Sequence, residues 1–151
     1  MLRALVVLLS LAGLADALYF TLAYYGRVKK ARWVPQILCA REGSSCVTVV
    51  QTPYARVFGV PNSLLGIVYY LMLIGWAVLG GEWSIVWVRP QSTVAFHWFR
   101  WGLVAMSGMT VLLGSYLICA LRRKLHVDCP LCYTAHAINA ALLVLLVLLA
   151  R

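Results

Sequence analysis

Four long apolar runs constrain this chain more than any other feature of its sequence. They lie at about residues 4–25, 62–80, 99–121 and 130–150. Each is close to the ~20 residues that a helix needs to cross the hydrocarbon core of a bilayer. The chain is 64% hydrophobic and 11% charged, which is more apolar surface than one soluble core of this size could bury. We therefore predict an all-α integral membrane protein, a four-helix bundle that forms a single domain over residues 1–151.

The first apolar run has a competing interpretation. Arg3 precedes it, and residues 15–17 (Ala-Asp-Ala) have the small-x-small form of a signal-peptide cleavage site, which would make residues 1–17 a leader. Because the run continues through Tyr25, we favour a membrane span. Asp16 then lies inside the membrane, where a carboxyl group is costly unless it faces the bundle or water. We expect it to hydrogen-bond a neighbouring helix rather than to relay protons.

Residues 26–61 form a connection between the first two runs that is too long for a simple turn. It carries Cys39 and Cys46, and the Gly-Ser-Ser sequence at residues 43–45 would let these two cysteines meet at a small entropic cost. A disulfide between them is feasible. Aromatic and apolar residues in the same segment indicate a loop that packs on the bundle as a lid.

A second pair of cysteines, Cys129 and Cys132, opens the last run with Pro130 between them. At the first turn of a helix, this i and i+3 spacing places both sulfurs on one side, close enough to bond each other or to share a ligand. Pro130 suits the first helical position, where its missing N–H is not needed. The positive end of the helix favours a thiolate. The pattern predicts a reactive dithiol at a helix mouth.

Counting membrane crossings places both cysteine pairs on one face. If the first run ends on one face, the second crosses away and the third returns, so Cys129 emerges beside the loop at 26–61. Thiol–disulfide exchange needs such an arrangement, because an attacking thiolate must reach a sulfur to form a mixed disulfide. A mobile loop that carries Cys39 and Cys46 would supply that reach.

The third run contains the fifth cysteine, Cys119, and three evenly spaced glycines, Gly102, Gly108 and Gly114. We expect Cys119 to be a small buried hydrophobic residue. The glycines are expected to allow close helix packing.

Basic residues outnumber acidic ones by 13 to 4, and the formal net charge is +9. They gather at the ends of the apolar runs, so we expect lipid headgroups, and no nucleic acid, as their partners. Nine would lie on the face of the cysteines and four on the other. The nine are Arg27, Lys29, Lys30, Arg32, Arg41, Arg56, Arg122, Arg123 and Lys124, and the four are Arg3, Arg89, Arg100 and Arg151. The positive-inside rule places the cysteine face in the cytoplasm.

Several motifs occur together along nearly the whole chain. They are Gly13-Leu14 with Leu18-Tyr19, the Cys39 and Cys46 pair, Thr52, Phe58-Gly59, Asn62-Ser63 with Gly66, and the C-x-x-C that opens the last run. In these the chain resembles the vitamin K epoxide reductase family, membrane thiol oxidoreductases linked to quinones. A C-x-x-C alone would be weak evidence, but its combination with four spans and a C-x6-C loop is specific.

The resemblance implies a role for each paired cysteine. Cys132 would face a quinone ring and exchange electrons with it. Cys129 would form a mixed disulfide with Cys46, and Cys39 would trade with a soluble thioredoxin-like partner. The expected activity is disulfide formation in that partner coupled to reduction of a membrane quinone of the ubiquinone, menaquinone or vitamin K type. We expect a monomer in the cell membrane, although the family usually faces an oxidising compartment, against the basic-residue bias.

The resemblance also implies a quinone pocket. Asn62 would donate a hydrogen bond to one quinone carbonyl, and Thr52 would stand beside the pocket. The family in animals has a tyrosine one helical turn after the second active cysteine, where this chain has His136, and Tyr133 is displaced to the position after Cys132. His136 would bind the other carbonyl or deliver a proton, and a purely structural histidine is the open alternative.

A rival hypothesis is a membrane protein that binds or transports a metal. Cys129 and Cys132 with His126 and His136 would supply two sulfur and two nitrogen ligands. This leaves the loop cysteines without a role, and His126 lies on the loop side while His136 is a turn into the membrane. We therefore expect no metal.

Overall fold

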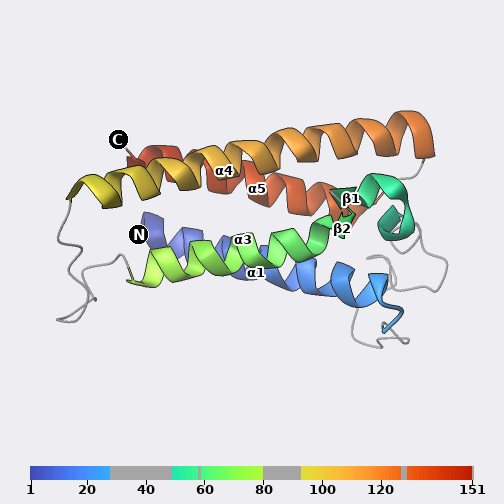
Figure 1. Cartoon of the computed structure of the whole chain (residues 1–151), viewed down its shortest axis with the longest axis horizontal. Coiled ribbons are helices and arrows are strands. Elements are labelled where there is room, and N and C mark those ends of the chain that lie inside the picture. Colours follow the sequence, from blue (N-terminus) through green and yellow to red (C-terminus); the bar gives the residue numbers. More distant parts are fainter. Residues whose placement is uncertain (28–48, 58, 80–92, 127–128, 151) are drawn as a thin grey trace.

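The computed structural model describes residues 1–27, 49–57, 59–79, 93–126 and 129–150. Four long helices run along one axis (Figure 1). They are α1 (Leu2–Tyr24), α3 (Asn62–Leu79), α4 (Thr93–Ala120) and α5 (Pro130–Ala150). All four are long and apolar enough to cross a membrane. The predicted all-α membrane bundle is confirmed, with α4 beginning at Thr93 rather than near Phe99.

Helix α1 packs against α3 and α5, and α4 packs against α5. Leucines of three helices fill the centre, and Leu73, Leu103 and Leu142 are at most 2% exposed. The outward faces are apolar as well: Leu8 and Leu112 are 63% and 68% exposed. Such faces suit lipid, which means that close packing and buried hydrogen bonds, rather than hydrophobicity, must fix how the helices meet.

Two tyrosines of α3 provide such hydrogen bonds. The hydroxyl of Tyr69 lies 2.8 Å from Ser107 Oγ on α4, and the hydroxyl of Tyr70 donates to Asn139 Oδ1 on α5 at 2.8 Å. A Cβ atom at Gly13 of α1 would overlap the ring of Tyr70. Glycine at this position therefore lets α1 approach α3 closely.

The segment before α3 is short but ordered. It contains a helical turn at residues 49–51, the 3-10 helix η1 (Pro53–Ala55) and a hairpin of β1 (Arg56–Val57) and β2 (Val60–Pro61). Gly59, in the hairpin turn, has a φ of +81°, which glycine adopts without strain. Figure 1 places this segment where α1 and α4 end and α5 begins, at the opposite end of the bundle from both termini.

Helix α4 continues directly into the π-helix η2 (Leu121–Leu125). Short π segments are frequent at functional sites. Here Leu121 is buried, while Arg122, Arg123 and Lys124 are exposed. The segment ends at His126, whose φ of 50° lies in the left-handed region that often terminates helices.

Candidate active site

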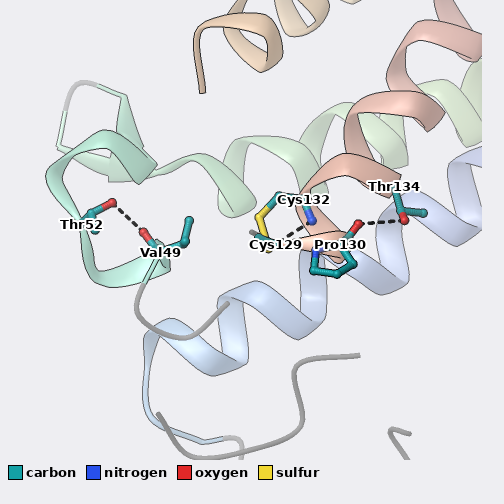
Figure 2. Close-up of a disulfide and its surroundings, with 6 residues drawn as sticks. All are labelled: Val49, Thr52, Cys129, Pro130, Cys132 and Thr134. Atoms are coloured by element: carbon teal, nitrogen blue, oxygen red, sulfur yellow. Dashed lines mark hydrogen bonds between the residues drawn. A yellow bond between two sulfur atoms is a disulfide. The ribbon is translucent and has the colours of Figure 1, made fainter. Parts of the chain in front are cut away.

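Cys129 and Cys132 form a disulfide at the first turn of α5 (Figure 2), with their Cα atoms 5.3 Å apart. Pro130 is the first residue of the helix, as the sequence predicts. The backbone N–H of Cys132 donates to Cys129 Sγ at 3.3 Å, and the N–H of Tyr133 donates to the carbonyl of Cys129 at 3.2 Å. The sulfur thus occupies the place of a helix-capping side chain. When the disulfide is reduced, this donor and the helix dipole would stabilise negative charge on Cys129.

A cavity of about 90 Å³, here called the sulfur cavity, lies beside Cys132. Its polar and reactive lining consists of Cys132, Asn62, Ser63 and His136. Its apolar lining consists of Phe20, Val49, Val50, Ala55, Leu117, Leu121 and Ala135. All four long helices and the segment before α3 contribute, so residues far apart in sequence line one cavity beside Cys132.

His136 lies one turn after Cys132 on the same face of α5. Its Nδ1 atom is buried and has no hydrogen-bond partner among the described residues. A Cβ atom at Gly114 of α4 would overlap its imidazole ring. Gly114 therefore makes room for the histidine. The predicted role in packing is wrong for Gly102 and Gly108, where no described atom lies within 4 Å of the position a Cβ would take.

Asn62 is the first residue of α3 and lines the sulfur cavity. Its neighbour Ser63 is tied to α1, because Thr21 Oγ1 lies 3.0 Å from Ser63 Oγ. This contact ties the first turn of α3 to α1 beside the sulfur cavity. A side-chain amide has two N–H donors, which suits a carbonyl ligand.

The segment before α3 covers the disulfide. Val49 and Val50 pack in one buried cluster with Phe20, Cys129 and Cys132, and Cys129 is fully buried. Thr52 Oγ1 donates to the carbonyl of Val49 at 2.7 Å, and Figure 2 shows Val49 between Thr52 and the disulfide. Thr52 therefore holds the covering turn and is not among the residues that line the sulfur cavity.

The family comparison agrees with this geometry. The family model described as the vitamin K epoxide reductase family matches residues 4–147. The chain belongs to the vitamin K epoxide reductase family. A search of the curated proteins found no match to it. Family membership makes the chain a membrane thiol oxidoreductase in its general class, and the four apolar helices make it a multi-pass membrane protein.

Two residues of this vitamin K epoxide reductase homologue lie away from where the sequence places them. Tyr133 does not line the sulfur cavity; its ring lies under the guanidinium of Arg122, 5.4 Å from ring centroid to Cζ. Cys119, expected to be buried, is exposed on α4 and forms no disulfide with the described cysteines. A bilayer removes the need to bury a small apolar thiol, because lipid tails suit it as well as a protein core does.

The loop cysteines of the homologue, Cys39 and Cys46, lie outside the described residues. Their predicted pairing and roles therefore stay predictions, as do the quinone contacts of Asn62, Thr52, Tyr133 and His136.

The metal hypothesis finds no support in the described part of the homologue. There, no group of three or more His, Cys, Asp or Glu residues is placed to hold a metal ion. The two sulfurs of the hypothetical site are bonded to each other. In this state neither is a thiolate, the form that binds metal.

The apolar residues that the helices contribute to the sulfur cavity are the part of the site that sequence reasoning missed, whereas Val49 and Val50 belong to the segment that it predicted to pack on the bundle. Leu117 and Leu121 are four residues apart on the α4–η2 helix, and Ala135 follows Cys132 by three residues on α5, so each shares a helix face with its partner. Phe20 is one apolar residue among many on α1. Nothing local distinguishes these residues from lipid-facing ones, so no sequence signal identifies them.

Proposed function

We propose that this family member oxidises the dithiol of a thioredoxin-like partner and passes the two electrons to a membrane quinone. Electrons would enter at Cys39 and Cys46 and leave at Cys129 and Cys132. One observation carries the proposal: Cys132, bonded to Cys129, shares the sulfur cavity with Asn62 and His136.

The inner step balances as a two-electron, two-proton exchange. The thiols of Cys129 and Cys132 become a disulfide, and the quinone becomes a quinol that carries both hydrogens. Asn62 would donate a hydrogen bond to one carbonyl. The imidazole of His136 would bind the other or deliver a proton to it. The mostly apolar walls suit the face of a quinone ring, since small-molecule sites combine an apolar lining with a few placed polar groups.

The outer step is thiol–disulfide exchange. A thiolate at Cys46 attacks Cys129, the Cys129–Cys132 bond breaks, and Cys132 leaves as a thiolate. Cys39 then attacks Cys46, which yields a loop disulfide and the reduced inner pair. Val49 already packs with Cys129, and the three-residue path from Val49 to Cys46 spans at most about 10 Å.

Cys129 is 0% exposed beneath the covering turn, so exchange requires that turn to shift. The disulfide form in the structure is the one that accepts electrons from loop thiols. The net direction depends on the two reduction potentials, because about 30 mV is worth about 1.4 kcal/mol for two electrons.

The sharpest test measures quinone reduction in nanodiscs, driven either by a reduced thioredoxin-like protein or by a small dithiol. We expect Cys132→Ser to abolish quinone reduction with both reductants. Cys39→Ser should lose the protein-driven reaction and keep the reaction with the small dithiol. Equal loss in both variants with both reductants would show that the proposed relay order is wrong.

We further propose that the active face is cytoplasmic. Nine of the 13 basic residues belong to that face, and of these Arg122, Arg123 and Lys124 are exposed around the end of α4. Intact cells that carry the Cys119→Ser protein would be treated with a membrane-impermeant thiol reagent. Cys39 should react only after the cells are permeabilised, and ready labelling from outside would refute this orientation.

A further inference from the structure

A second cavity, here called the carboxyl cavity, lies between α1 and α5 and measures about 300 Å³. Asp16 and Tyr19 of α1 and Thr134 of α5 supply its polar groups. Ala12 and Ala15 leave the space, because their side chains are single methyl groups. At about 100° per residue, Thr134 points roughly 160° away from both Cys132 and His136 around the axis of α5. The cavity is therefore separate from the sulfur cavity, although both use the first turns of α5.

Two of its three polar residues, Asp16 and Thr134, have oxygens that can accept a hydrogen bond, and the third, Tyr19, has a hydroxyl that can also donate. Asp16 Oδ1 is buried and has no hydrogen-bond partner among the described residues, contrary to the expected bond to a neighbouring helix. Thr134 Oγ1 donates its only hydrogen to the carbonyl of Pro130 at 3.0 Å, which leaves its oxygen able only to accept (Figure 2). An unpaired polar group is costly in an apolar environment. The cavity therefore suits a ligand that brings hydrogen-bond donors.

The depth of Asp16 restricts what that ligand can be. Asp16 lies eight residues before the end of α1 at Tyr24, which is roughly 12 Å along the helix at about 1.5 Å per residue. Half the hydrocarbon core is about 15 Å, so Asp16 lies among acyl chains, while Leu131 and Thr134 in the first turns of α5 carry the other wall of the cavity toward the helix mouth. The ligand must carry its donors on an apolar body. A quinol does so with two ring hydroxyls, whereas a quinone has only carbonyl acceptors.

We propose that the carboxyl cavity binds a quinol through its ring hydroxyls, in preference to the corresponding quinone. A carboxyl group keeps an acceptor oxygen in either protonation state, so a quinol satisfies Asp16 in both states, and a quinone only when Asp16 is protonated. The identity of the ligand rests on the proposed function, in which quinol is the product. The carboxyl cavity then holds product on the outer seam of α1 and α5, apart from the site of reduction.

The test uses the full chain as Cys132→Ser in phosphatidylcholine nanodiscs, so that no turnover changes the ligand. Binding of a radiolabelled short-tailed ubiquinol, and of its quinone, would be measured at equilibrium as the part that Ala15→Leu removes, so that ligand in the sulfur cavity is not counted. We expect the quinol to bind roughly tenfold more tightly. Asp16→Leu should remove that preference. Equal binding of the two forms, or a preference that survives in Asp16→Leu, would overturn the proposal.

Further variants separate this site from a folding defect. Ala15→Leu fills the carboxyl cavity and should remove quinol binding there, while Ala105→Leu, the same change at an exposed position on α4, should not. Asp16→Asn keeps the shape and adds an amide donor, so quinone binding should rise and the preference should fall. If Asp16→Asn leaves both affinities unchanged in a folded protein, the proposal fails.

A lipid headgroup is the competing source of donors. Adding phosphatidylethanolamine to the nanodiscs should leave quinol binding unchanged. If this lipid displaces the quinol from the parent protein but not from Asp16→Leu, the assignment of the cavity to a quinol is wrong. A separate turnover assay tells the two proposals apart. If the protein reduces quinone but shows no preference for quinol that depends on Asp16, only this inference fails. If the preference for quinol is present but no dithiol drives quinone reduction, only the proposed function fails.

Discussion

The sulfur cavity and the carboxyl cavity use different faces of the same first turns of α5 and offer a ligand different chemistry. The sulfur cavity lies under Val49 and Val50 and presents the amide of Asn62 and the imidazole of His136, groups that can donate to carbonyls. The carboxyl cavity presents the acceptors of Asp16 and Thr134. If both proposals hold, the cavity on one side of α5 offers donors to the oxidised ligand, and the cavity on its other side offers acceptors to the reduced ligand. The difference is one of hydrogen-bonding polarity, since both cavities have largely apolar walls.

The largest effect on this contrast is expected from Gly114→Ala. The added methyl group would overlap the imidazole of His136 and displace it from the sulfur cavity. Because small misplacements of reacting groups reduce rates steeply, we expect quinone reduction to fall by about tenfold to a hundredfold. Gly108→Ala on the same helix meets no described atom within 4 Å and is the matched control. If Gly114→Ala and Gly108→Ala have the same steady-state rate of quinone reduction, the position assigned to His136 in the sulfur cavity is wrong.

Asn62→Ala should have a smaller effect. It removes one donor to the quinone carbonyl, which corresponds to about a three- to tenfold loss in kcat/KM for the quinone. Reduction of the Cys129–Cys132 disulfide by loop thiols should continue at its normal rate, as measured by trapping free thiols in the absence of quinone. If Asn62→Ala slows the reduction of the Cys129–Cys132 disulfide, Asn62 acts on the sulfurs rather than on the quinone.

Thr52→Val should affect only the cover of the sulfur cavity. It removes the hydrogen bond to the Val49 carbonyl, and we expect thiol–disulfide exchange to change by about two- to fivefold. Ser115→Ala removes a hydrogen bond of the same kind, from Ser115 Oγ to the Val111 carbonyl at 2.9 Å, on the exposed face of α4. Stopped-flow exchange should distinguish the pair. Equal rates in the two variants would mean that the covering turn does not depend on Thr52.

The smallest effect is expected from Cys119→Ser. This thiol is exposed on α4 and does not line either cavity, so activity should stay within about twofold of the parent protein. Labelling by a membrane-permeant maleimide should lose its Cys119 adduct. A marked loss of turnover would show that Cys119 takes part in electron transfer. The reactive sulfurs would then not be confined to the sulfur cavity.

The architecture of the fold was predictable because its signals are local. The lengths of the apolar runs define the spans, and the spacing of Cys129 and Cys132 around Pro130 places the disulfide at a helix mouth. The hairpin before α3 was not predicted, because its two-residue strands are too short to show an alternating pattern. Gly102 and Gly108 show the same limit, since glycine spacing alone does not say which neighbour a helix face will meet.

The sequence by itself determined the class of protein, the number of spans and the position of the inner cysteine pair at the start of the last helix. Only the tertiary structure decided that Asn62 and His136 share a cavity with Cys132, that Tyr133 lies under Arg122, that Cys119 faces outward and that Asp16 lines a second cavity. The reason is physical. A membrane helix is apolar on every side, so hydrophobicity does not specify its rotation about its own axis. That rotation is set by contacts such as Gly13 on Tyr70 and Gly114 on His136, which exist only once the helices are packed.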